Sequence, residues 1–196
     1  MTMDTSKIGP NSIIQTVKAL REAQGEEKVH KLLHNAELEK YLQILPSEMV
    51  DEEEFIRLVH ALVELCGYDV AKKVLRTSGQ YTGTYLLENR IPRVAQWLFG
   101  VVPKSVGMNL FLKAIGKNAW TFVGSGSFTY QVQGNESYIK IENSINSRGL
   151  RAEEPLCAFY TGTFEKLFQT LIDRKLQVNE SKCIACGDNF CYFEVK

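Results

Sequence analysis

The sequence predicts an α+β fold in which an N-terminal helical layer packs on a C-terminal antiparallel sheet. As far as Gly116, apolar residues recur at three- and four-residue steps, the period of an amphipathic helix. After Gly116 the chain is rich in β-branched and aromatic residues with partial alternation, which is typical of strands. Helices therefore come first and strands later, with one further helix among the strands, and this order favours α+β over alternating α/β.

The helices of the first half are expected where apolar periodicity lies between capping residues and breakers. Asn11-Ser12 can cap the first, and Gly67 ends a later one. Residues 51–54, Asp-Glu-Glu-Glu, form an acidic first turn that the helix dipole favours. The expected helices cover residues 11–25, 26–34, 51–66, 69–77, 82–88, 91–98 and 105–115.

The second half predicts consecutive antiparallel strands and one helix. Turn residues at Gly124-Ser-Gly126 and Gly134-Asn135 separate the first three strands. A helix with Phe159, Phe164 and Phe168 at helical steps then precedes two closing strands. The expected strands cover residues 120–123, 127–133, 137–142, 176–178 and 190–195, and the helix covers residues 155–172.

Length and composition indicate a globular protein with a core of its own. The chain has 196 residues, of which 44% are hydrophobic and 23% charged. Because Pro46-Ser47 breaks the helical pattern, we expect a helical extension over residues 1–45 and the main domain over residues 46–196.

Charge and hydropathy exclude several classes of protein. Lys plus Arg and Asp plus Glu both number 23, so the net charge is zero and no nucleic-acid partner is expected. No apolar run approaches the ~18 residues of a transmembrane segment, and the N-terminus has no apolar signal core. A cytoplasmic protein is expected, whose five cysteines are thiols or metal ligands rather than disulfides.

The strongest chemical signal is the cysteine spacing near the C-terminus. Cys183-x2-Cys186-x4-Cys191 places thiolates around a turn, an arrangement that suits zinc. Glu180 and Cys157 are further candidates, so five groups compete for four positions. A closed set of protein ligands predicts a structural rather than a catalytic ion. Cys66, on an apolar helix face, is expected in the core.

The same residues resemble a known family. Glu180-x2-Cys183-x3-Gly187-x3-Cys191-Tyr-Phe, with Cys157 upstream, is similar to the signature of the 4-vinyl reductase domain family. Residues 8–11 and 84–92 resemble its bacteriochlorophyll-biosynthesis branch. The resemblance implies zinc held by Cys157, Glu180, Cys183 and Cys191, with Cys186 as a spare thiol or a substitute for Glu180.

The resemblance also implies a fold and a ligand. The fold is that of haem-NO-binding domains and vesicle-tethering subunits, with an apolar cavity between helices and sheet. The implied ligand is a tetrapyrrole of the chlorophyll pathway. Aromatic and apolar residues are candidates to line the pocket, and two arginines could bind pigment carboxylates. These candidates are Arg90, Arg93, Trp97, Met108, Phe111, Trp120, Phe122 and Tyr130.

Three functions are compatible with these residues. We expect a non-catalytic tetrapyrrole-binding accessory protein, because the only glycine-rich turn, Gly124-Ser-Gly126, lies between expected strands and lacks the third glycine of a nicotinamide site. The alternatives are an 8-vinyl reductase and a sensory module for another apolar molecule. Other pigment-biosynthesis enzymes and a second copy of the chain are the expected macromolecular partners.

Overall fold

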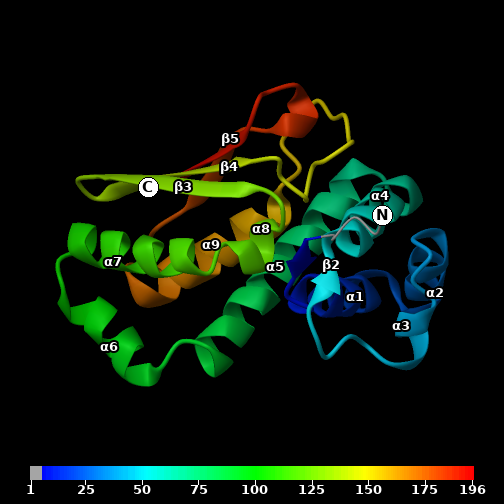
Figure 1. The fold of residues 1–196 in the computed structure, drawn as a ribbon, viewed down its shortest axis with the longest axis horizontal. Helices are drawn as coiled ribbons and strands as arrows, with labels where there is room; N and C mark the ends of the chain where they lie inside the picture. Colours follow the sequence, from blue (N-terminus) through cyan, green and yellow to red (C-terminus); the bar gives the residue numbers. More distant parts are fainter. Residues whose placement is uncertain (1–5) are drawn as a thin grey trace.

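A four-stranded antiparallel sheet lies over a layer of helices in the computed structural model, which describes residues 6–196 (Figure 1). Residues 1–5, the start of the predicted extension, lie outside the described residues. The strand order is β3-β4-β6-β5. The helices are α1 (Asn11–Gln24), α2 (Glu26–Asn35), α3 (Lys40–Gln43), α4 (Glu52–Cys66), α5 (Tyr68–Asn89), α6 (Arg93–Val101), α7 (Lys104–Lys117), α8 (Trp120–Val123) and α9 (Ala158–Leu171). The strands are β1 (Lys7–Ile8), β2 (Val50–Asp51), β3 (Ser127–Gln133), β4 (Glu136–Glu142), β5 (Val178–Lys182) and β6 (Cys191–Val195).

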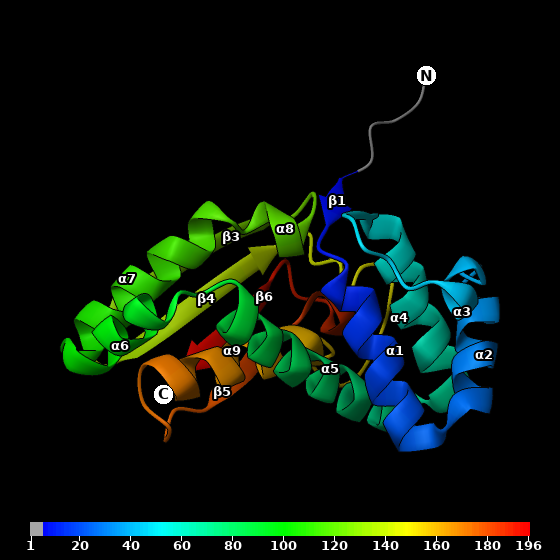
Figure 2. The ribbon, with the colours of Figure 1, turned by 90° about the horizontal axis from the view of Figure 1, so that it is seen from below.

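The predicted fold class is confirmed: helices α7 and α9 pack on one face of the sheet, and the remaining helices extend from them (Figures 1 and 2). Alternate residues of β4 and β6, such as Ile139, Ile141 and Phe193, point into this layer and are fully buried. The predicted turn at Gly134-Asn135 joins β3 to β4, and Gly134 adopts the positive φ of 59° that such a turn requires. Among residues 6–196, no helix has the length and apolar composition to cross a membrane.

The N-terminal helices pack on α5. Thr16 of α1 and Ser78 of α5 share a buried hydrogen bond of 2.8 Å between their hydroxyl oxygens. Ile13, Val17 and Leu20 of α1 are fully buried. The short pair of β1 and β2 joins the start of the described chain to the segment before α4. The division at residue 45 stays a prediction.

Residues 69–88, predicted as two helices, form the single helix α5. The sequence around Gly79 and Gly83 resembles a break, but these glycines instead allow α9 to approach. A Cβ atom at Gly79 would lie 2.1 Å from the Phe159 carbonyl oxygen, and one at Gly162 would lie 2.2 Å from that of Arg76. The backbones of α5 and α9 therefore touch, which fixes the position of α9.

Residues 120–123, predicted as a strand, instead form the helical turn α8. The amides of Thr121 and Phe122 donate to the carbonyls of Asn118 and Ala119, and the Thr121 hydroxyl also donates to Asn118. These local bonds override the strand propensity of four β-branched and aromatic residues. Gly124-Ser-Gly126 consequently connects a helix to β3 and is not a hairpin turn.

Candidate metal centre

Four acidic side chains from separate parts of the C-terminal region converge at one point. Cys157 precedes α9, Glu180 lies in β5, Cys183 follows β5, and Cys191 begins β6. One ligand atom from each of the four lies within 4.8 Å of the others. The three cysteines are fully buried, and Glu180 is 8% exposed. The residues that the family resemblance implied are thus brought together in the interior.

A β-bulge allows β5 to contribute two neighbouring ligands to the same side. Val178 and Glu180 face inward in alternation, so strict alternation would bury Lys182 and expose Cys183. The register with β6 shifts between Glu180 and Lys182, and this extra residue turns Cys183 inward. Cys191 faces the same side through the regular alternation of β6.

Sulfur separations match those around one tetrahedral ion. The Cys157 sulfur lies 3.3 Å from that of Cys191 and 4.0 Å from that of Cys183, and Cys191 and Cys183 are also 4.0 Å apart. Zinc–sulfur bonds of about 2.3 Å in a tetrahedron place sulfurs about 3.8 Å apart. All three distances exceed the ~2.05 Å of a disulfide bond, and all five cysteines, each within the described chain, are free thiols.

Glu180 presents an oxygen that lacks a protein partner. Its Oε2 accepts a hydrogen bond of 2.8 Å from the Cys157 amide, at the positive end of α9. Its Oε1 is buried and has no hydrogen-bond partner within residues 6–196. Leaving a buried carboxylate oxygen unpaired is costly, and a bound cation removes that cost. The donor set of three sulfurs and one oxygen therefore fits zinc.

The protonation of the cluster also favours a bound positive charge. Burial raises the pKa of the Cys157 thiol well above its usual range. Burial, together with the neighbouring Cys183, raises the pKa of Glu180 to about 9. Hydrogen bonds from Cys157 and Cys191 hold the pKa of Cys183 well below its usual range. Four acidic groups so close together can all ionise only if a cation lies among them.

Small polar groups surround the sulfurs. The Leu156 and Ile184 amides each lie 3.5 Å from a ligand sulfur, that of Cys183 and of Cys191 respectively. The hydroxyl of Ser144 lies 3.3 Å from the Cys157 sulfur, and that of Ser147 lies 3.4 Å from the Cys191 sulfur. Such donors offset the excess negative charge of a zinc site with three thiolates. The sequence analysis missed both serines, whose only signal is a polar run after an expected strand.

Cys186 lies outside this group. It belongs to a 3-10 helix at Ile184–Cys186, and its side chain is exposed. It lines a groove of about 980 Å³ together with Tyr68, Lys72 and residues 150–154, among others. The Lys182 ammonium lies 5.3 Å from the centre of the Phe190 ring. Cys66, expected in the core, is half-buried against it.

The predicted pigment contacts divide into an inner and an outer set. Met108 and Phe111 are buried, and Phe122 and Tyr130 are half-buried. Arg90, Arg93, Trp97 and Trp120 are exposed. The inner aromatic side chains already contact their neighbours: Phe111 meets Phe99 and Phe168, and Phe122 meets Phe128, Tyr160 and Phe164.

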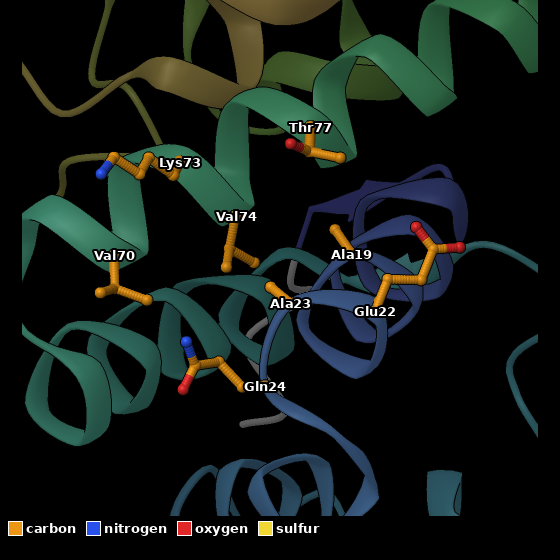
Figure 3. A pocket seen from close by; sticks show the side chains of 8 residues that line it. All are labelled: Ala19, Glu22, Ala23, Gln24, Val70, Lys73, Val74 and Thr77. Atoms are coloured by element: carbon orange, nitrogen blue, oxygen red, sulfur yellow. The ribbon is translucent and has the colours of Figure 1, made fainter.

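A second hollow lies between α1 and α5, away from both sets. Figure 3 shows its wall, with Glu22 and Gln24 on one helix and Lys73 and Thr77 on the other. Its volume is about 400 Å³, and none of the predicted pigment contacts lines it or the groove beside Cys186.

The fold and the cluster together define a class. Residues 137–196, which hold three of the four strands of the main sheet and all four clustered groups, match the model of the 4-vinyl reductase domain family. In structure, the chain resembles an H-NOX protein from K. algicida, with a TM-score of 0.62 and 13% identity over 96% of each chain. It also resembles the phenol-responsive sensory domain of the transcription activator PoxR, with a TM-score of 0.55 and 17% identity over 78% of each chain. The predicted likeness to haem-NO-binding folds is confirmed.

Similarity over nearly the whole chain gives the narrower assignment. The bacteriochlorophyll synthase 23 kDa chain of Rhodobacter capsulatus is 34% identical over 97% of this chain and 87% of its own length. Its counterpart in Cereibacter sphaeroides is 32% identical over 96% of this chain and 90% of its own length. The protein belongs to the family of the bacteriochlorophyll synthase 23 kDa chain, which confirms the resemblance inferred from the sequence.

Proposed function

We propose that the protein is a tetrapyrrole-binding accessory protein of bacteriochlorophyll biosynthesis, built around a structural zinc ion. The observation that carries the proposal is the similarity, over almost its full length, to the 23 kDa chains named for bacteriochlorophyll synthase. The four-ligand cluster supports the second part, because a closed set of protein ligands leaves no open position for a substrate.

Zinc would join the closing strands to α9. Cys157 precedes the helix, whereas Glu180, Cys183 and Cys191 belong to β5, β6 and their connection. One ion bound by all four therefore fixes the helix against the sheet edge. Aromatic rings of α9 and β6 pack on the same interface, since Phe164 and Phe193 have ring centres 5.7 Å apart.

The pigment would bind where α7 and α8 meet β3 and α9. Phe111 and Phe122 lie there, and Tyr130 flanks them from β3. Because these rings contact their neighbours, a macrocycle needs part of the helical layer to move outward. Helix α6 is the element suited to move, since none of its residues is buried. Arg90 and Arg93, at its start, are then available to pair with pigment carboxylates.

An absorbance titration tests the proposal. The purified protein is mixed with Mg-protoporphyrin or protochlorophyllide, and we expect a saturable shift of the pigment bands. Phe122→Ala, which opens space at the inner set, should alter the affinity, whereas Ile44→Ser on the distant, exposed α3–β2 connection should not. No saturable shift at micromolar protein with either pigment would contradict the proposal. Reduction of a divinyl pigment with NADPH or reduced ferredoxin would favour the reductase instead.

A further inference from the structure

Helix α6 presents apolar side chains to solvent. Val94, Trp97, Leu98 and Val101 follow one another at three- and four-residue steps along one face. All four are exposed, with Val94 at 79% and Trp97 at 68%. Gln96, the one uncharged polar residue of the helix, points inward, where its amide donates to the carbonyls of Leu87 and Ile91. The usual distribution of an amphipathic helix is thus reversed.

The apolar surface continues beyond α6. Helix α7 exposes Val106 and Leu110, and α8 exposes Trp120. Figure 1 shows α6 at the edge of the molecule, with α7 between it and the sheet. We call the span from α6 to α8, residues 93–123, the outer helical segment. It holds both tryptophans of the protein. It also holds seven of the large hydrophobic side chains that are exposed within residues 6–196.

Charge on this part of the chain has one sign. Residues 89–135 contain five basic residues and no acidic one. Since the whole chain has 23 of each, the remainder carries five more acidic than basic residues. Lys104 pairs with Asp173 at 3.4 Å. The other four basic residues make no ion pair within the described chain. These are Arg90, Arg93, Lys113 and Lys117.

We propose that the outer helical segment docks on a membrane surface containing anionic lipids. Exposed tryptophan and aliphatic side chains enter the interface between headgroups and acyl chains, and lysine and arginine pair with lipid phosphates. The nine residues of α6 span only about 14 Å, so the helix lies in the surface and does not cross the ~30 Å core.

Charge favours a lipid surface over a second copy of the chain. A symmetric dimer through this segment would bring two sets of unpaired basic groups together without an acidic group to balance them. An anionic bilayer supplies the opposite charge and an apolar layer at once. The proposal concerns the outer side of α6 to α8 and does not depend on pigment binding.

Tryptophan fluorescence tests the proposal directly, because both tryptophans lie in the segment. The full chain is mixed, at low salt and without pigment, with vesicles of phosphatidylglycerol and phosphatidylcholine that carry brominated acyl chains. We expect a blue shift, quenching by bromine and co-sedimentation. All three should weaken with added salt and with vesicles of phosphatidylcholine alone. In Trp120→Phe the remaining reporter is Trp97, and its signal should persist.

Variants separate the apolar from the charged contribution. Trp97→Ser should weaken partitioning about tenfold, and the pair Lys113→Gln and Lys117→Gln should weaken it about 25-fold at low salt. The matched controls Ile44→Ser and Lys31→Gln with Lys73→Gln lie outside the segment and should leave it unchanged. Absence of vesicle binding at low salt would overturn the proposal, as would equal losses in the controls. A dimer that hides the tryptophans and binds no vesicles would overturn it as well.

Discussion

The metal cluster and helix α6 both reverse the usual distribution of side chains, in opposite directions. The cluster buries four ionisable groups, including a carboxylate oxygen without a partner. Helix α6 leaves four large apolar side chains in solvent beside unpaired basic groups. The direction of each reversal indicates what is bound: buried acids need a cation, and exposed apolar and basic groups suit an apolar, anionic surface. It also predicts where stability resides, with large effects around the cluster and small ones on α6.

The largest effect is expected at the cluster. Cys183→Ser should remove the metal and lower the free energy of unfolding by about 5 kcal/mol or more, because structural zinc binding is coupled to folding. Denaturant unfolding measures this loss. The matched control is Cys186→Ser, three residues away but exposed, which should change stability by less than about 0.5 kcal/mol. Equal losses in both variants would contradict the ligand assignment.

The next effect comes from the contact that positions α9. Gly79→Ala should destabilise by about 3 kcal/mol, because its Cβ would lie 2.1 Å from the Phe159 carbonyl oxygen. Gly100→Ala, on the exposed α6, meets nothing within 4 Å and should stabilise by about 0.5–1 kcal/mol. The two substitutions make the same chemical change, so a similar thermal shift in both would show that the two regions do not differ as described.

A smaller, pH-dependent effect is expected at Glu52. Its buried carboxylate accepts hydrogen bonds of 2.6 Å from both the Ser125 amide and hydroxyl, and pairs with Arg148 at 3.0 Å. Burial opposes ionisation, but the bonds from Ser125 and Arg148 outweigh it and lower the pKa of Glu52. Glu52→Gln should therefore cost about 2 kcal/mol at neutral pH, given that Arg148 is partly exposed.

The sign of the pH effect follows from the lowered pKa of Glu52. A carboxyl whose pKa is lower in the folded than in the unfolded state stabilises above its unfolded pKa, about 4.3. That stability is lost as the pH falls through the folded-state pKa. The difference in unfolding free energy between wild type and Glu52→Gln should therefore shrink below about pH 4. A difference that stays constant down to the acid transition would exclude this role.

The smallest effect on stability is expected on α6. Val94→Ser and Leu98→Ser should change the free energy of unfolding by less than about 0.5 kcal/mol without lipid, because both side chains are exposed. Both should weaken vesicle binding. A loss of more than about 1 kcal/mol would show that α6 packs against the core in solution.

The comparison also explains what the sequence could predict. The amphipathic helices, the turn at Gly134 and the cluster ligands Glu180, Cys183 and Cys191 follow from local patterns or short spacings. Cys157, far from the others in sequence, was assigned through the family resemblance. The continuous α5 was missed because the role of Gly79 depends on α9, about 80 residues later. Ser144 and Ser147 were missed because their value depends on sulfurs from elsewhere in the chain.

Trp97 and Trp120 show the reverse limit. Their apolar character predicted a pocket lining, whereas both are exposed in the structure. Apolar periodicity locates one face of a helix but does not say whether that face meets the core or the solvent. The bulge in β5 is a similar case, since Glu180-Ser-Lys-Cys183 carries no local sign that the register shifts there.

Metal content of the purified full-length protein tests the central claim most directly. Elemental analysis should find one zinc ion per chain in the wild type and in Cys186→Ser, and none in Cys183→Ser or Cys191→Ser. Zinc retained in both ligand variants, or lost in Cys186→Ser alone, would contradict the account.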